Sequence, residues 1–145
     1  MKLLIINGPN LNLLGTREPE IYGALTLSAM EDMIRACAAG CGCAADFFQS
    51  NCEGAIIDAL HAAAGMYGGI IINPGAYSHY SYAIADALRA VPLPAVEVHL
   101  SNIAARERFR KISVTAAACV GSVSGLGAEG YLAAVRYLAA SVNPL

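Results

Sequence analysis

The sequence predicts an α/β protein in which a parallel sheet of five strands is covered by helices on both faces. Short apolar runs alternate with segments of helical pattern along the 145 residues. Such alternation is typical of parallel sheets, because each strand needs a crossover helix to reach its parallel neighbour. Two of the apolar runs stop abruptly at polar turn residues, which marks the carboxyl ends of those strands.

The first strand and the first long helix have clear local signals. Residues 2–6 form a short apolar run that is typical of a buried strand. A helix is expected to follow Leu27, because Ser28 and Glu31 have the spacing of a capping box. The Gly40–Gly42 pair should end this helix.

The middle of the chain continues the alternation. Residues 45–50 are expected to form the second strand, and residues 54–64 have the pattern of a helix. Residues 69–73 form a fully apolar third strand, which Pro74 and Gly75 stop.

The last third adds two strands and two helices. A helix is expected at 81–91, a fourth strand at 95–100, a fifth strand at 119–123 and a closing helix at 128–141. The glycine-rich stretch 121–127 lacks the order G-x-G-x-x-G, so it predicts a strand-to-helix turn rather than a nucleotide loop.

These elements predict a flavodoxin-like three-layer sandwich with strand order 2-1-3-4-5. In such sheets ligands bind beyond the carboxyl ends of the strands, at the point where the strand order reverses. That point lies between the first and third strands. The loop 7–23, the turn 73–75 and the strand end 99–102 should converge there.

Composition narrows the function classes. The chain is 57% hydrophobic, 14% charged and carries a net charge of −2, which gives no electrostatic footprint for nucleic acid. The basic run 106–111 is interrupted by Glu107 and is expected to lie in a solvated helix or turn. No apolar run is long enough to span a membrane, and no secretory signal is evident. We expect a single cytoplasmic catalytic domain over residues 1–145, which buries further area between subunits.

Five cysteines are present, and three of them cluster at Cys37, Cys41 and Cys43. An odd number in a chain without a secretory signal predicts reduced thiols. The spacing is not a common zinc spacing. Small apolar side chains at a helix end are therefore expected rather than a metal site.

The long loop Asn7–Gly23 (NGPNLNLLGTREPEIYG) carries side chains suited to an oxyanion, namely Asn10, Asn12, Arg17 and Tyr22. It lacks the lysine of a phosphate-binding loop. A tyrosine has a pKa near ~10, and a nearby guanidinium such as that of Arg17 favours its phenolate. Alternatively, Tyr22 anchors the loop and Arg17 lies on the surface, which the residues alone favour.

Glu97, His99 and Ser101 alternate along a strand end, so they should share one face. A glutamate two residues before a histidine can fix its tautomer and support its cation, which makes the histidine a proton donor. The alternative is a structural ion pair.

Two further residues lie at the expected edge of the sheet. Asn73 can hold a hydroxyl or a reacting carbonyl, or it can simply end its strand. His79 can contact hydroxyls, or it can lie on the surface. His61, within a predicted helix, is expected to be structural or exposed.

Four segments, in this order, resemble the type II 3-dehydroquinate dehydratases. They are the loop 7–23, QSNCEG at 49–54, INPGAYSHYS at 72–81 and VEVHLSN at 96–102. The resemblance covers nearly the whole chain. It implies an anti elimination of water from 3-dehydroquinate, which gives 3-dehydroshikimate through an enolate.

The resemblance also implies a role for each matching residue. Tyr22 would be the base, Arg17 its activator, Asn12 a group near the enolate oxygen, and His99 the acid that Glu97 orients. The implied substrate-binding residues are Asn73, His79, Asp86, Leu100, Ser101 and Arg110, of which Asp86 would reach a neighbouring subunit's site. The family needs no metal or organic cofactor, assembles as a dodecamer of trimers, and serves the shikimate pathway of aromatic amino acid biosynthesis or quinate breakdown.

The chain departs from the family pattern at Cys52, Ala55 and Ala104, none of which has an implied catalytic role. A Schiff-base mechanism is not expected, because neither Lys2 nor Lys111 is placed as a desolvated nucleophile. Two alternatives stay open: a lyase or hydrolase acting on another hydroxylated carboxylic acid, and a flavodoxin-like binding module.

Overall fold

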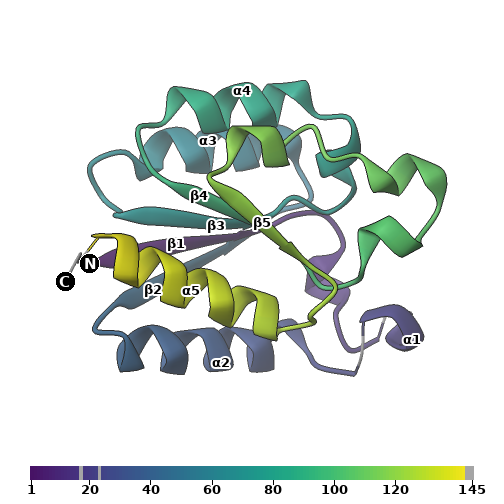
Figure 1. The fold of residues 1–145 in the computed structure, drawn as a ribbon, viewed down its shortest axis with the longest axis horizontal. Coiled ribbons are helices and arrows are strands. Elements are labelled where there is room, and N and C mark those ends of the chain that lie inside the picture. The colour runs from purple at the N-terminus through teal and green to yellow at the C-terminus, as the bar shows by residue number, and fades with distance from the viewer. Residues whose placement is uncertain (17, 23, 143–145) are drawn as a thin grey trace.

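The chain folds into a parallel five-stranded sheet between two layers of helices (Figure 1). The computed structural model describes residues 1–16, 18–22 and 24–142. The strand order is β2-β1-β3-β4-β5, which confirms the predicted topology. The strands are β1 (Lys2–Asn7), β2 (Ala44–Gln49), β3 (Gly69–Asn73), β4 (Ala95–His99) and β5 (Gly121–Ser124).

Two helices cover each face of the sheet. Figure 1 shows α2 and α5 below it and α3 and α4 above it. The α-helices are α1 (Pro19–Tyr22), α2 (Leu27–Gly40), α3 (Glu53–Ala63), α4 (Tyr82–Ala90) and α5 (Glu129–Val142). The described residues also form short 3-10 helices, which are η1 (Leu11–Leu13), η2 (Gly75–His79), η3 (Ile103–Ala105), η4 (Arg108–Lys111) and η5 (Ala116–Ala118). Among the helices in the described ranges, none has the length and apolarity that crossing a membrane requires.

The central strand β1 shows how the sequence builds two cores. Leu3 and Ile5 point to the α2 and α5 side, whereas Leu4 and Ile6 point to the α3 and α4 side. These four side chains are at most 5% exposed. Burying such a side chain contributes about 1.5–3 kcal/mol, so the continuous apolar run fixes β1 in the middle of the sheet.

The predicted start of the first long helix was correct, but its cap was wrong. The Oγ1 of Thr26 accepts the N–H of Ala29 at 3.1 Å, so Thr26 is the N-cap. Ser28 lies inside the first turn of α2. The expected capping box of Ser28 and Glu31 is therefore not the device that starts α2.

The fifth strand begins two residues later than expected. The segment before it forms η5, and the N–H of Val120 then donates to the carbonyl of Ala95 at 2.8 Å. Residues 121–124 belong to β5, so the expected turn over 121–127 is confined to its last part. Gly125 and Gly127, with φ of 90° and 57°, make the turn into α5. The other boundaries agree with the prediction to within one residue.

Candidate active site

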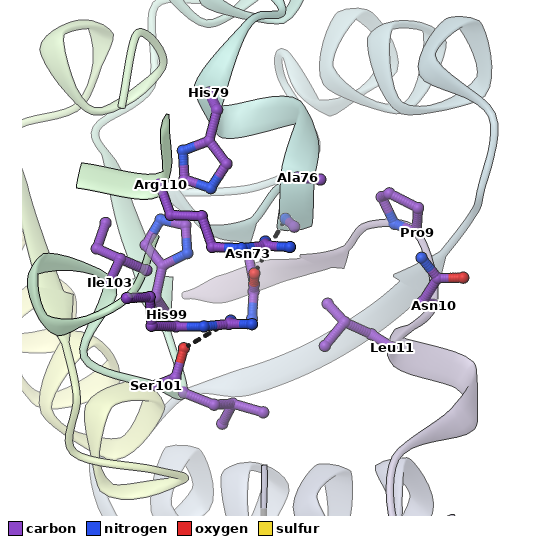
Figure 2. A pocket seen from close by; sticks show the side chains of 13 residues that line it. Pro9, Asn10, Leu11, Asn73, Ala76, His79, His99, Ser101, Ile103 and Arg110 are labelled. Atoms are coloured by element: carbon purple, nitrogen blue, oxygen red, sulfur yellow. Dashed lines mark hydrogen bonds between the residues drawn. The ribbon is translucent and has the colours of Figure 1, made fainter. Parts of the chain in front are cut away.

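A pocket lies beyond the carboxyl ends of β1, β3 and β4, at the predicted reversal of strand order (Figure 2). In Figure 2, His79, Arg110, His99 and Ser101 stand on one side and Pro9, Asn10 and Leu11 on the other. The full lining consists of Pro9, Asn10, Leu11, Asn73, Gly75, Ala76, His79, His99, Leu100, Ser101, Ile103, Arg106 and Arg110.

The loop after β1 forms one wall because its backbone packs directly on the turn after β3. The N–H of Gly8 donates to the carbonyl of Asn73 at 2.8 Å. A Cβ at position 8 would lie 2.6 Å from the carbonyl oxygen of Pro74. Glycine therefore lets the two turns approach closely enough to form the wall.

Side chains of the motif at 49–54 hold this wall in place through hydrogen bonds to the backbone of the loop after β1. Gln49 donates its Nε2 to the carbonyl of Gly8 at 3.2 Å, and the Oδ1 of Asn51 accepts the N–H of Asn10 at 3.0 Å. Tyr77 donates its hydroxyl to the carbonyl of Asn51 at 2.7 Å. Asn10 has a positive φ of 69°, a conformation that asparagine tolerates better than most residues.

His99 and Glu97 form a buried pair at the end of β4. The Nε2 of His99 lies 2.9 Å from the Oε2 of Glu97, and the two side chains are 7% and 1% exposed. This confirms that the two residues share one face and are hydrogen-bonded. Because Nε2 is engaged by the carboxylate, Nδ1 is the nitrogen available for proton exchange with a ligand.

The carboxylate of Glu97 has two further partners that the sequence did not reveal. Ser113 donates its hydroxyl to Oε2 at 2.6 Å, and Thr115 donates to Oε1. Both residues lie between η4 and η5, remote in sequence from β4. No local spacing signals such a contact.

Asn73 is held by a second buried network. Its Nδ2 donates to the hydroxyl of Tyr131 at 3.0 Å, and its Oδ1 accepts the N–H of Gly75 at 3.1 Å. Tyr131 in turn donates to the Oδ1 of Asn7 at 2.7 Å. Burial raises the pKa of the Tyr131 hydroxyl, so it remains protonated and can donate.

Two arginines give the pocket positive charge. Arg110 pairs with Glu107 through Nε at 2.7 Å, and Arg106 donates its Nη1 to the Oγ of Ser101 at 3.3 Å. Their side chains are 20% and 14% exposed. The expectation that the basic run is solvated was therefore wrong for Arg106, because η3 and η4 fold it back against the end of β4.

His79 closes the pocket from η2. Its Nδ1 lies 2.8 Å from the carbonyl of Ile112. A carbonyl only accepts, so Nδ1 carries the proton and Nε2 remains an acceptor in the neutral ring. His79 lines the pocket and is half-buried, so it is not simply a surface residue.

Asn12 and Asp86 do not line this pocket, although a role in the site was expected for both. Asn12 is exposed in η1, and Asp86 is exposed on α4, where it pairs with Arg89 at 3.2 Å. Arg17 lies outside the described residues. Tyr22 is the last residue of α1, and its side chain is outside the part of the structure that is described.

The cysteine cluster shows no metal-binding arrangement. Cys43 is buried, and Cys37 and Cys41 are half-buried at the end of α2. Over the described ranges, no three His, Cys, Asp or Glu side chains are grouped as metal ligands. His61 is exposed on α3, one of the two alternatives expected for it.

Comparison with known proteins agrees with this geometry. The sequence profile of the family described as "Dehydroquinase class II" matches residues 1–139. The chain belongs to the class II dehydroquinase family. The crystal structure of the type II dehydroquinase from Butyrivibrio crossotus superposes on this dehydroquinase with a TM-score of 0.93 at 48% identity, covering 95% of this chain and 97% of that one.

Sequence relatives give the same result. The 3-dehydroquinate dehydratase of Bacillus subtilis is 56% identical over 135 residues, which is 93% of this chain and 91% of that protein. The catabolic 3-dehydroquinase of Emericella nidulans is 53% identical over 143 residues, 99% of this chain and 94% of that protein. The family resemblance seen in the four motifs is thereby confirmed.

Proposed function

We propose that this class II dehydroquinase removes water from 3-dehydroquinate to give 3-dehydroshikimate. The observation that carries the proposal is the buried His99–Glu97 pair, which opens into a pocket that Arg106 and Arg110 also line, at the switch point of the sheet. A histidine held in this way can protonate a leaving hydroxyl. The dehydratases that share more than half of their residues with this chain are named for this substrate.

The lining suits a small hydroxylated carboxylate. Arg106 and Arg110 supply positive charge, and His79 offers Nε2 as an acceptor for a hydroxyl. Asn73 is fixed by its network with its amide at the edge of the pocket. Leu100 and Ser101 line the same space, and we propose that their backbone N–H groups hold the carboxylate, as such groups commonly do.

The proposed reaction uses one base and one acid. Tyr22, activated by Arg17, takes a proton from the carbon beside the ketone. The electrons of that C–H bond form an enolate, which polar groups near Asn12 stabilise. The enolate then expels the hydroxyl, and Nδ1 of His99 protonates it so that it leaves as water. Glu97 remains bonded to Nε2–H and stabilises the imidazolium before this transfer.

Neither lysine supports the alternative Schiff-base chemistry. Lys2 begins β1, at the amino edge of the sheet, and its Nζ pairs with Asp46 at 2.6 Å. Lys111 is exposed in η4 and does not line the pocket. An acid–base route therefore agrees better with the described residues than a Schiff-base route does.

We also propose that residues 1–145 act as one cytoplasmic catalytic domain within a dodecamer of trimers. The low charge content supports subunit contacts, as does the exposure of Tyr80 and Tyr82, at 59% and 71%, at the start of α4. Asp86, on the same helix, would then reach a neighbouring pocket. Such an enzyme serves the shikimate pathway or quinate catabolism.

The proposal is tested by following the ultraviolet absorbance of the conjugated enone product. Wild type should convert 3-dehydroquinate, and its activity should survive treatment with borohydride in the presence of substrate. The variant Tyr22→Phe should have lost this activity. Folded wild type that leaves 3-dehydroquinate unchanged would exclude this substrate and favour a lyase for another hydroxy acid.

A further inference from the structure

We propose that Ser113 and Thr115 are positioning residues for the proton transfer by His99, because they fix the carboxylate that orients its imidazole. This inference rests on the proposed function. Neither residue lines the pocket, so neither is placed to touch substrate. Both would act through Glu97.

The two hydroxyls hold both oxygens of the carboxylate. Ser113 donates to Oε2 at 2.6 Å, and Thr115 donates to Oε1. His99 approaches Oε2 through Nε2 at 2.9 Å. A carboxylate with donors on both oxygens cannot rotate or shift without losing at least one of these bonds. The direction in which it receives Nε2–H is therefore fixed.

The hydroxyl of Ser113 has a defined donor direction. Its oxygen accepts the N–H of Ala116 at 3.0 Å, so its own hydrogen is available to Glu97. The Oγ1 of Thr115 lies 3.1 Å from the same oxygen. The segment between them is anchored to η2, since the N–H of Val114 donates to the carbonyl of Ser78 at 2.7 Å.

The thiol that lies beside this carboxylate adds no competing charge. Thr115 is fully buried, and its carbonyl accepts from the thiol of Cys119 at 3.6 Å. Burial and the negative charge of Glu97 raise the pKa of that thiol to about 12, so it stays neutral. Within the described residues near the carboxylate, its three donors match the acceptor-only chemistry of an ionised group.

A functional consequence follows for the histidine. With Nε2–H directed at a fixed carboxylate, the neutral ring adopts the tautomer that leaves Nδ1 unprotonated. The same arrangement places the acidic proton of the cation on Nδ1, the nitrogen available to the pocket. Loss of the two hydroxyls should free the carboxylate and mix the tautomers.

The test compares wild type, Thr115→Val, Ser113→Ala, the double variant and the conservative variant Thr115→Ser. Nitrogen-15 NMR of the three histidines reports the ring tautomer, and His99→Asn assigns the signal of His99. Kinetics with 3-dehydroquinate give kcat and KM separately, and thermal unfolding shows that each variant is folded.

Wild type and Thr115→Ser should show a single Nε2–H tautomer of His99 at high pH. The double variant should show both tautomers and a kcat about tenfold or more below wild type, part of the gain that acid–base catalysis supplies. Its KM should change by less than about threefold, because the substrate contacts remain. If the double variant does not fold, the two single variants should show the same changes to a smaller degree.

The inference is overturned if folded variants keep one tautomer, keep kcat within twofold of wild type, or lose only thermal stability. It is also overturned if Thr115→Ser loses as much activity as Thr115→Val. Inactive wild type would instead refute the proposed function, while the NMR comparison would still decide whether the two hydroxyls orient the ring.

Discussion

The hydroxyl of Tyr131 lies 3.0 Å from the Nδ2 of Asn73, although the two residues are 58 positions apart. The hydroxyl has one hydrogen, which it donates to the Oδ1 of Asn7 at 2.7 Å, so it must accept from Asn73. This fixes which end of the Asn73 amide is the donor. Helix α5, which packs against one face of the sheet, thereby fixes a pocket residue at the end of β3.

Tyr131→Phe should destabilise the protein and weaken catalysis. Both amides would keep their burial but lose a partner, which costs about 1–3 kcal/mol in the free energy of unfolding. Urea unfolding measures this, and the kinetic loss should appear in kcat/KM. The control is Tyr137→Phe, because that side chain is 53% exposed on the same helix. Equal stability of the two variants would contradict the role of the network.

Gly8→Ala should be strongly unfavourable. The added Cβ would meet the carbonyl oxygen of Pro74 at 2.6 Å, so the wall of the pocket would have to move. Overpacking of this kind costs about 1–3 kcal/mol. Gly54→Ala is the matched control, because no atom lies within 4 Å of its added Cβ. In α3 this change should be neutral or stabilise by up to about 1 kcal/mol. Equal unfolding temperatures for Gly8→Ala and Gly54→Ala would show that the turns after β1 and β3 can move apart without cost.

The ion pair of Lys2 and Asp46 should stabilise the fold at neutral pH, and this stabilisation should disappear in acid. Hydrogen bonds from Lys2 and then from Tyr67 hold the pKa of Asp46 below its ordinary value of 3.8. A depressed carboxyl pKa stabilises the fold above the unfolded value, and this contribution disappears as the pH falls through the folded value. Asp46→Asn should therefore be less stable than wild type at about pH 6, and the difference should shrink below about pH 4. Urea midpoints that differ equally at both pH values would argue against this linkage.

Cys119 should resist alkylation. Burial and the charge of Glu97 raise the pKa of its thiol to about 12, and only the thiolate is a good nucleophile. Cys52 is exposed at the start of α3. Iodoacetamide treatment at about pH 8.5, followed by peptide mass spectrometry, should label Cys52 well before Cys119. Labelling of Cys119 first, in the folded protein, would contradict its burial beside the carboxylate.

Much of the fold follows from local patterns. The continuous apolar runs at β1 and β3 specified central strands, and the resulting strand order located the pocket. The spacing of Glu97 and His99 along β4 was enough to predict their contact, because alternate residues of a strand share a face. These inferences needed no knowledge of distant partners.

Other features depend on long-range contacts that no spacing encodes. Ser113 and Thr115 reach Glu97 only because η4 and η5 fold back over the end of β4. Arg106 was expected in solvent although its partner Ser101 is only five positions away, because the turn that brings the two side chains together follows no regular spacing. The start of β5 was misplaced because η5 and a backbone bond to Ala95 precede it, and both depend on the sheet.

The rate of enone formation from 3-dehydroquinate by wild type and by His99→Asn tests whether the His99–Glu97 pair drives the reaction. His99 is proposed as the acid that protonates the leaving hydroxyl. Its loss should lower kcat by about 100-fold or more, with KM changed far less. The variant His61→Asn alters an exposed histidine of α3 and should retain full activity. A His99→Asn enzyme that turns over within a few fold of wild type would show that His99 is not the acid.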